Sequence, residues 1–243
     1  MFSTNHFIWL TLCALFITTM SIISVKLRWS FKTATAVVCG ISLASELCKI
    51  FTHIDQSVDK DGSVTSGVLG PEYLPLHLCS ILIFLLFYLL LSKNDARKET
   101  VKSFILPIAI LGGTLALLIP TSGVNFARPY AYQCFVYHSG ILWYGIYLLA
   151  TRQVSLGVRA YKRTMLLLGC LVIVMLWINS LLSVYETNFF YLTRPPMDNL
   201  PVLNLKNGWF AYFFTLIGIG VVAVSAVYLP SIISEIRAMK KEK

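Results

Sequence analysis

The chain alternates between long apolar stretches and short polar connections. Seven apolar stretches of 17 to 22 residues contain almost no charged side chains. A helix needs roughly 20 apolar residues to cross the hydrocarbon core of a bilayer. The pattern therefore predicts seven transmembrane helices, at about 7–25, 33–51, 73–91, 103–119, 131–150, 164–185 and 209–229. The fourth stretch is the weakest, because it is the shortest and carries Pro107 near its start.

Composition agrees with this pattern. Hydrophobic residues make up 57% of the 243 residues, and charged residues only 13%. Soluble domains carry about 25% charged residues, roughly twice that share. We therefore expect an all-α membrane protein in which residues 1–243 form a single polytopic membrane domain.

The distribution of basic residues predicts the orientation. The net charge is +9, and 15 of the 20 Lys and Arg residues fall in every second connection or in the tail, at 26–32, 93–102, 152–163 and 237–243. Cytoplasmic connections of membrane proteins are enriched in Lys and Arg. This indicates an N-terminus outside and a C-terminus inside, which requires an odd number of spans. The expected location is the cell membrane, multi-pass, and binding to nucleic acid is not expected.

The cysteines do not indicate a metal centre. None of the six forms a CxxC pair or has the spacing of a metal site, and most fall within predicted spans. A cysteine in such a span is usually a small hydrophobic residue. We therefore expect no metal, no cofactor and no disulfide framework.

Polar side chains gather in the predicted outer half of the membrane domain, whereas the inner halves of the spans are almost purely apolar. Ionisable groups within a bilayer cost about 2.5–3.5 kcal/mol each at a helix centre on insertion scales and mark functional sites. The pattern predicts a polar pocket open to the outer leaflet. The candidate substrate-binding residues are Glu46, Lys49, His77, Asn125, Arg128, Gln133 and Asn179, and the candidate catalytic residues are Cys79 and His138.

Several of these residues have a structural interpretation as well. Glu46 and Lys49 lie three apart on one helix face and also suit an ion pair with each other. Gly112 and Ala116 are spaced for close packing between helices. If the helix is regular, His77 and Cys79 point about 200° apart. A dyad of Cys79 with His138 from another helix has no such obstacle, and a thiol with a nearby base suits acyl transfer.

Five segments, read in order, resemble the bacterial YwaF-like integral membrane proteins: "EYLPLHLCS", "GGTLALLIPTS", "YQCFVYHSGI", "NSLLSVYETNFFYLTRPP" and "NGWFAYFF". The resemblance covers about residues 40–230. That group is itself distantly similar to an animal transmembrane acyltransferase that remodels ether phospholipids through a cysteine nucleophile. Carried over to this chain, the resemblance implies Cys79 in "LPLHLCS" as the nucleophile and His138 as its partner.

Two classes of function follow from the sequence. The first is a lipid acyltransferase or lipid hydrolase that uses Cys79 and His138, with membrane lipids as its partners. The alternative is a seven-helix lipid- or solute-binding protein, or a small transporter, in which the same pocket binds without catalysis. The sequence shows no internal repeat of the kind common in transporters. It leaves the oligomeric state and the role of an accessory subunit open.

Overall fold

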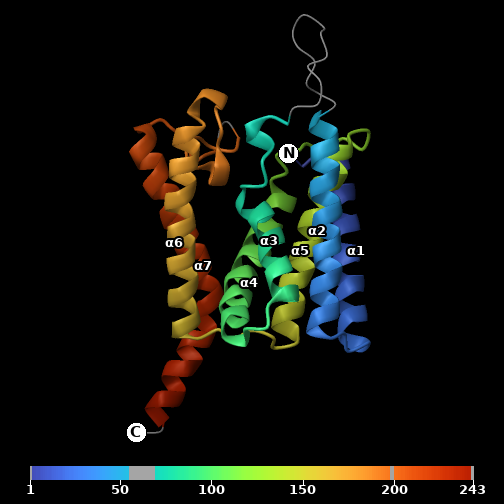
Figure 1. The fold of residues 1–243 in the computed structure, drawn as a ribbon, viewed down its shortest axis with the longest axis vertical. Coiled ribbons are helices and arrows are strands. Elements are labelled where there is room, and N and C mark those ends of the chain that lie inside the picture. Colours follow the sequence, from blue (N-terminus) through green and yellow to red (C-terminus); the bar gives the residue numbers. More distant parts are fainter. Residues whose placement is uncertain (1, 55–68, 198–199, 242–243) are drawn as a thin grey trace, which may run out of the picture.

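The computed structural model describes residues 2–54, 69–197 and 200–241, and these residues fold entirely into helices, turns and loops (Figure 1). Seven α-helices follow one another: α1 Thr4–Lys26, α2 Phe31–Ile54, α3 Leu78–Leu91, α4 Asp95–Leu118, α5 Pro129–Ala150, α6 Val158–Leu181 and α7 Gly208–Lys241. Three short 3₁₀ helices complete the described chain: η1 Pro71–Tyr73, η2 Ser183–Tyr185 and η3 Phe189–Tyr191.

The described helices confirm the all-α class and agree with a membrane protein. Five of the described helices, α1, α2, α4, α6 and α7, are long and apolar enough to cross a membrane. The other two are shorter or less apolar. Helix α3 is apolar but only 14 residues long. Helix α5 has 22 residues but carries several tyrosines together with Gln133 and His138. That each of the seven crosses the bilayer stays a prediction.

The connections fall at the two ends of the bundle as the basic residues suggested. The start of α1, residues 69–77 before α3, the connection before α5 and the described residues just before α7 lie at one end, at the top of Figure 1. The connections after α1, α3 and α5 lie at the opposite end, together with the end of α7. The basic segments therefore share one end of the molecule. Their assignment to the cytoplasmic side remains a prediction.

Helix α5 forms the centre of the bundle, with α1, α2 and α4 packed around it. Its residues Trp143, Tyr144 and Tyr147 are almost fully buried. The close approach between α4 and α5 occurs at Gly113 and not, as predicted, at Gly112. A Cβ atom on Gly113 would lie 2.9 Å from Leu142 Cβ and 3.1 Å from the His138 carbonyl oxygen, whereas one on Gly112 would meet only Ile108, at 4.0 Å.

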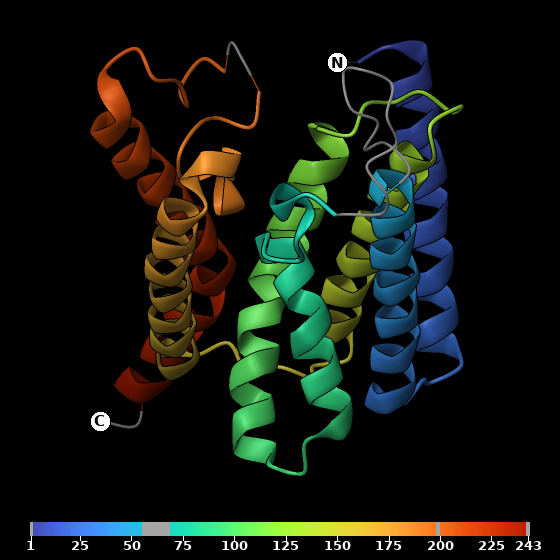
Figure 2. The same cartoon turned by 45° about the horizontal axis from the view of Figure 1, so that its top comes forward.

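Helices α6 and α7 pack on the α4 side of the bundle, away from α1 and α2 (Figure 2). A buried polar contact joins the three helices. The Tyr228 hydroxyl of α7 donates to the Ser103 carbonyl oxygen of α4 at 2.8 Å and lies 2.8 Å from Thr164 Oγ1 of α6. Because apolar side chains gain little by leaving lipid for another helix, such hydrogen bonds help to hold membrane helices together.

Two helix boundaries differ from the predicted spans in ways that matter for the site. Helix α3 begins at Leu78, five residues after the predicted start of that span. Helix α7 has 34 residues and continues through Pro230, twelve residues beyond the predicted end of its span. At 1.5 Å per residue, α7 is about 51 Å long, much longer than the roughly 30 Å hydrocarbon core. It extends past the other helices at the C-terminal end (Figure 1).

Candidate functional site

Helix α3 begins at Leu78, three residues after Pro75. The residue before a proline is disfavoured from helical conformation, and Leu74 is extended, with φ −56° and ψ 147°. His77 is also extended and forms the N-cap, but its side chain accepts no hydrogen bond from the first turn. The helix therefore begins without a side-chain cap. Its first N–H groups have no intrahelical acceptor, as at any helix N-terminus.

Cys79 occupies the second position of α3, next to these N–H groups. The backbone N–H groups of Cys79 and Ser80 are among the first of α3, which have no intrahelical acceptor. The N-terminus of an α-helix carries a partial positive charge, and such positions stabilise a thiolate. The same N–H groups are suitable donors for the oxyanion of an acyl-transfer intermediate. The position of Cys79 thus suits a nucleophile for reasons that the sequence did not reveal.

The ion pair predicted between Glu46 and Lys49 is confirmed. Lys49 Nζ lies 2.5 Å from Glu46 Oε1, and the two side chains are only 9% and 12% exposed. The second carboxylate oxygen of Glu46 accepts a hydrogen bond from Ser80 Oγ at 3.4 Å. Because Ser80 follows Cys79 in the first turn of α3, this bond ties the ion pair of α2 to the helix end that carries the thiol.

Tyr137 of α5 also contacts this region. It is 3% exposed, and its hydroxyl donates to the carbonyl oxygen of Cys79. Together, Glu46, Lys49, Cys79, Ser80 and Tyr137 form what we call the Cys79 cluster. Helices α2, α3 and α5 thus meet at one point through Glu46, Ser80 and Tyr137. Sequence analysis missed both Ser80 as a link and Tyr137 as a contact, because neither contact follows from spacing along one helix.

His138 lies next to Tyr137 in α5 and bonds within its own helix. Its Nδ1 lies 2.7 Å from the Cys134 carbonyl oxygen and 3.6 Å from Cys134 Sγ. A carbonyl oxygen can only accept, so Nδ1 carries the proton and Nε2 is left with its lone pair. Among the described residues, no hydrogen bond joins His138 to the Cys79 thiol. The predicted dyad is therefore not formed as a direct contact in this structure.

His77 lies outside α3, as its N-cap. The angle of about 200° between His77 and Cys79, which assumes that both lie in one regular helix, therefore does not apply. Its ring packs 5.4 Å from the rings of both Phe189 and Tyr191. These aromatic residues belong to η3, in the segment between α6 and α7. Phe190 and Tyr191 have φ of 60° and 56°, which non-glycine residues rarely adopt. The segment next to His77 is thus held in a costly conformation.

Asn179 maintains that conformation. It is 3% exposed, its Nδ2 donates to the Phe189 carbonyl oxygen at 3.0 Å, and its Oδ1 accepts from the Phe189 N–H at 2.9 Å. Both ends of the amide are engaged by one buried residue. Asn179 therefore positions the segment that contacts His77, and its amide does not face the Cys79 cluster.

The remaining predicted residues lie on the periphery of the cluster. Gln133 of α5 donates to Ser45 Oγ at 2.8 Å, one residue from Glu46. Asn125 and Arg128 are exposed in the connection before α5, where Asn125 Oδ1 accepts from the Ala127 N–H at 2.9 Å. The structure thus brings Glu46, Lys49 and Cys79 together, with His77, Gln133 and His138 adjacent, and leaves Asn125 and Arg128 at the surface.

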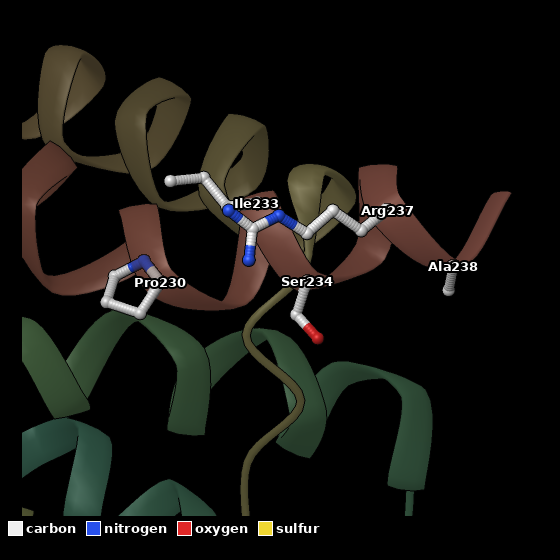
Figure 3. Close-up of a pocket in the computed structure, with 5 residues that line it drawn as sticks. All are labelled: Pro230, Ile233, Ser234, Arg237 and Ala238. Atoms are coloured by element: carbon white, nitrogen blue, oxygen red, sulfur yellow. The ribbon is translucent and has the colours of Figure 1, made fainter. Parts of the chain in front are cut away.

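A separate hollow of about 360 Å³ lies on α7, far along the chain toward the C-terminus. It is lined by Pro230, Ile233, Ser234, Arg237 and Ala238, all from the part of α7 that extends beyond the predicted span (Figure 3). This hollow is at the opposite end of the bundle from Cys79 and contains none of the predicted site residues.

No group of three or more His, Cys, Asp or Glu side chains suited to a metal ion occurs within residues 2–54, 69–197 and 200–241. The chemistry available at the cluster is that of a thiol at a helix N-terminus, a buried ion pair and an imidazole with a free lone pair. Such a set suits nucleophilic and acid–base steps.

The apolar helices and the polar cluster between α2, α3 and α5 define a multi-pass helical membrane protein. The model of the TMEM164 family matches residues 1–228, and the chain belongs to this family. No curated protein and no solved structure matches the chain significantly. The resemblance to YwaF-like proteins is not tested by these comparisons.

Proposed function

We propose that the protein is a lipid acyltransferase or lipid hydrolase whose nucleophile is Cys79. The observation that carries this proposal is the position of Cys79 in the uncapped first turn of α3, beside the buried Glu46–Lys49 pair. The resemblance to a cysteine-dependent phospholipid acyltransferase supports the same residue. Membrane lipids are the natural substrates for a site within an apolar bundle.

The chemistry requires two steps. In the first, the Cys79 thiolate attacks the carbonyl carbon of an acyl ester, the ester C–O bond breaks, and the acyl group becomes a thioester. The alcohol oxygen leaves with a proton. In the second step, a hydroxyl of an acceptor lipid, or water, attacks the thioester and restores the thiol. The backbone N–H groups of Cys79 and Ser80 would stabilise the oxyanion in both steps.

His138 is the proposed proton carrier. The bond from Nδ1 to the Cys134 carbonyl oxygen leaves Nε2 as the basic nitrogen. The ring would take the proton of Cys79 or of the acceptor hydroxyl and return it to the leaving oxygen. Because catalytic hydrogen bonds are often long in unliganded enzymes and shorten when substrate binds, the proposal requires His138 and Cys79 to approach in the substrate complex.

Arg128 is the proposed contact for a phosphate head group. It is exposed at the N-terminus of α5, where both its charge and the helix end favour an anion. Arg194 is also a basic residue of this end of the molecule, but its guanidinium is already engaged by Glu186. It pairs with the Glu186 carboxylate and donates to the Glu186 carbonyl oxygen.

Lipid profiling tests the function. Membranes that contain the wild type, Cys79→Ser or His138→Ala at equal expression would be compared with membranes lacking the protein, with Cys170→Ser as the matched control. Cys170 is an exposed cysteine of α6. We expect the wild type and Cys170→Ser to change the acyl-chain pattern and Cys79→Ser to abolish the change. Loss of a general base costs about 10²–10⁴-fold in rate. Membranes with His138→Ala should therefore have nearly the same acyl-chain pattern as membranes lacking the protein.

A second readout is the thioester itself. Purified wild type incubated with phospholipid should carry an acyl group on Cys79 that hydroxylamine releases. An unchanged acyl-chain pattern in Cys79→Ser, relative to wild type, would refute catalysis by Cys79. Saturable lipid binding by a wild type that never alters acyl chains would instead favour the binding protein without catalysis.

A further inference from the structure

The Glu46–Lys49 pair is unusual among the ion pairs of the described residues. Two other pairs with the same i,i+3 spacing lie at the start of α4, Lys98 with Asp95 and Lys102 with Glu99. Their carboxylates are 90% and 38% exposed, whereas that of Glu46 is 12% exposed. Removing an ion pair from water has a desolvation cost that often exceeds the attraction between the charges. Stability alone therefore does not explain a buried pair in an apolar helix.

The position of the pair suggests another role. Ser80, the residue that follows Cys79, bonds Glu46, so the carboxylate and the ammonium lie beside the first turn of α3, which carries the thiol. The residue that bonds Glu46 is the direct neighbour of Cys79 in the first turn of α3. A thiolate is the reactive form of cysteine, and a nearby ammonium stabilises it.

We propose that Lys49 is a positioning residue that stabilises the Cys79 thiolate, with Glu46 fixing the ammonium and Ser80 joining the pair to α3. This inference rests on the proposed function, and it gives Lys49 a role other than the substrate binding predicted from the sequence. The two charges oppose each other at the thiol. Glu46 limits the effect of Lys49, so that the balance between them sets the reactivity of Cys79.

The other titratable groups around Cys79 do not supply a comparable charge. From α5 these are Tyr130, Cys134 and Tyr137, and from the segment after α6 it is Tyr191. Phenols and thiols are uncharged at neutral pH at their ordinary pKa values. His77, just before α3, packs against aromatic rings. His138, the proposed proton carrier, has its proton on Nδ1 and a lone pair on Nε2, and so carries no charge in this structure. The Glu46–Lys49 pair is therefore the charged group to vary.

The rate of Cys79 alkylation measures this effect without any lipid chemistry. The full-length protein in lipid nanodiscs would be treated with N-ethylmaleimide over a range of pH, and mass spectrometry would follow the peptide that contains Cys79. The variants are Lys49→Met, Lys49→Arg and Glu46→Gln. Lys98→Met is the matched control, because it breaks a pair of the same spacing in α4. The Cys170 peptide is the internal reference.

The expected changes have opposite signs. A nearby opposite charge shifts the equilibrium between thiol and thiolate by about one pH unit or more. Lys49→Met should therefore slow Cys79 alkylation about tenfold at a fixed pH below the midpoint of the profile. Glu46→Gln should accelerate it, because the ammonium is left unopposed. Lys49→Arg should restore most of the wild-type rate, and Lys98→Met and the Cys170 peptide should be unchanged.

The opposite signs separate an electrostatic role from a structural one. Damage to the fold would change both variants in the same direction. Three outcomes would overturn the inference. Lys49→Met and Glu46→Gln could change the rate in the same direction, neither could change it, or Cys79 could fail to react in every variant. If the opposite effects appear while wild-type membranes keep an unaltered acyl-chain pattern, the role of Lys49 stands and the proposed catalysis fails.

Discussion

Replacing Asn179 by alanine tests whether this residue maintains the segment after α6 or contacts substrate. The side chain makes two hydrogen bonds to the backbone of Phe189, which is fully buried. A buried donor or acceptor left without a partner costs about 1–3 kcal/mol. Asn179→Ala leaves both the N–H and the carbonyl oxygen of Phe189 without a partner. We therefore expect it to lower the free energy of unfolding by at least about 2 kcal/mol.

The assay is thermal unfolding of the purified protein, followed by tryptophan fluorescence. For a chain of this size, each kcal/mol corresponds to about 2–4 °C in unfolding temperature, so a decrease of about 4–8 °C is expected. Asn125→Ala is the matched control. Asn125 also bonds a backbone N–H, but it is exposed, and water can replace the bond. Its substitution should change the unfolding temperature by less than about 2 °C.

The prediction also concerns activity. Well below its unfolding temperature, Asn179→Ala should retain the wild-type effect on lipids per folded molecule, because its amide is engaged by Phe189 rather than by substrate. A variant with normal stability and lost activity would refute the positioning role and return Asn179 to the substrate-binding residues.

Three further predictions concern the fold. Single cysteines placed at 93–102 should resist an impermeant maleimide applied to intact cells, and labelling from outside would refute an N-terminus outside and a C-terminus inside. Tyr228→Phe should lower the stability of the protein by about 1 kcal/mol, because the hydroxyl bonds both Ser103 and Thr164; an unchanged unfolding temperature would contradict it. Glu235→Gln should lower stability by less than about 1 kcal/mol, since the Glu235 carboxylate accepts from the Val158 N–H at the start of α6; a loss as large as that of Asn179→Ala would show a further role.

Periodicity along one helix predicted some local features of the site correctly. The pairing of Glu46 with Lys49 follows from a spacing of three on one helix, and the structure confirms it. The same kind of argument failed for His77 and Cys79, because His77 is extended and α3 begins only at Leu78. Because α3 begins five residues later than predicted, Cys79 lies in the first turn of the helix and not in its second.

Contacts between helices were beyond the reach of sequence patterns. Gly113 rather than Gly112 faces α5, and the choice depends on the rotation of α4 about its axis. Asn179 was predicted to line a pocket because it lies at the same depth as the other polar residues. Depth along the membrane normal does not specify which way a side chain points, and this one bonds Phe189.

The sequence by itself determined that this is a helical membrane protein and which segments form its helices, because the length and apolarity of a span are local properties. It also determined which connections carry the basic residues. Only the tertiary structure decided that Cys79 lies at a helix N-terminus, joined through Ser80 to the Glu46–Lys49 pair and through its carbonyl oxygen to Tyr137. These contacts depend on how α2, α3 and α5 are rotated and offset against one another. Packing among residues far apart in the chain sets these quantities.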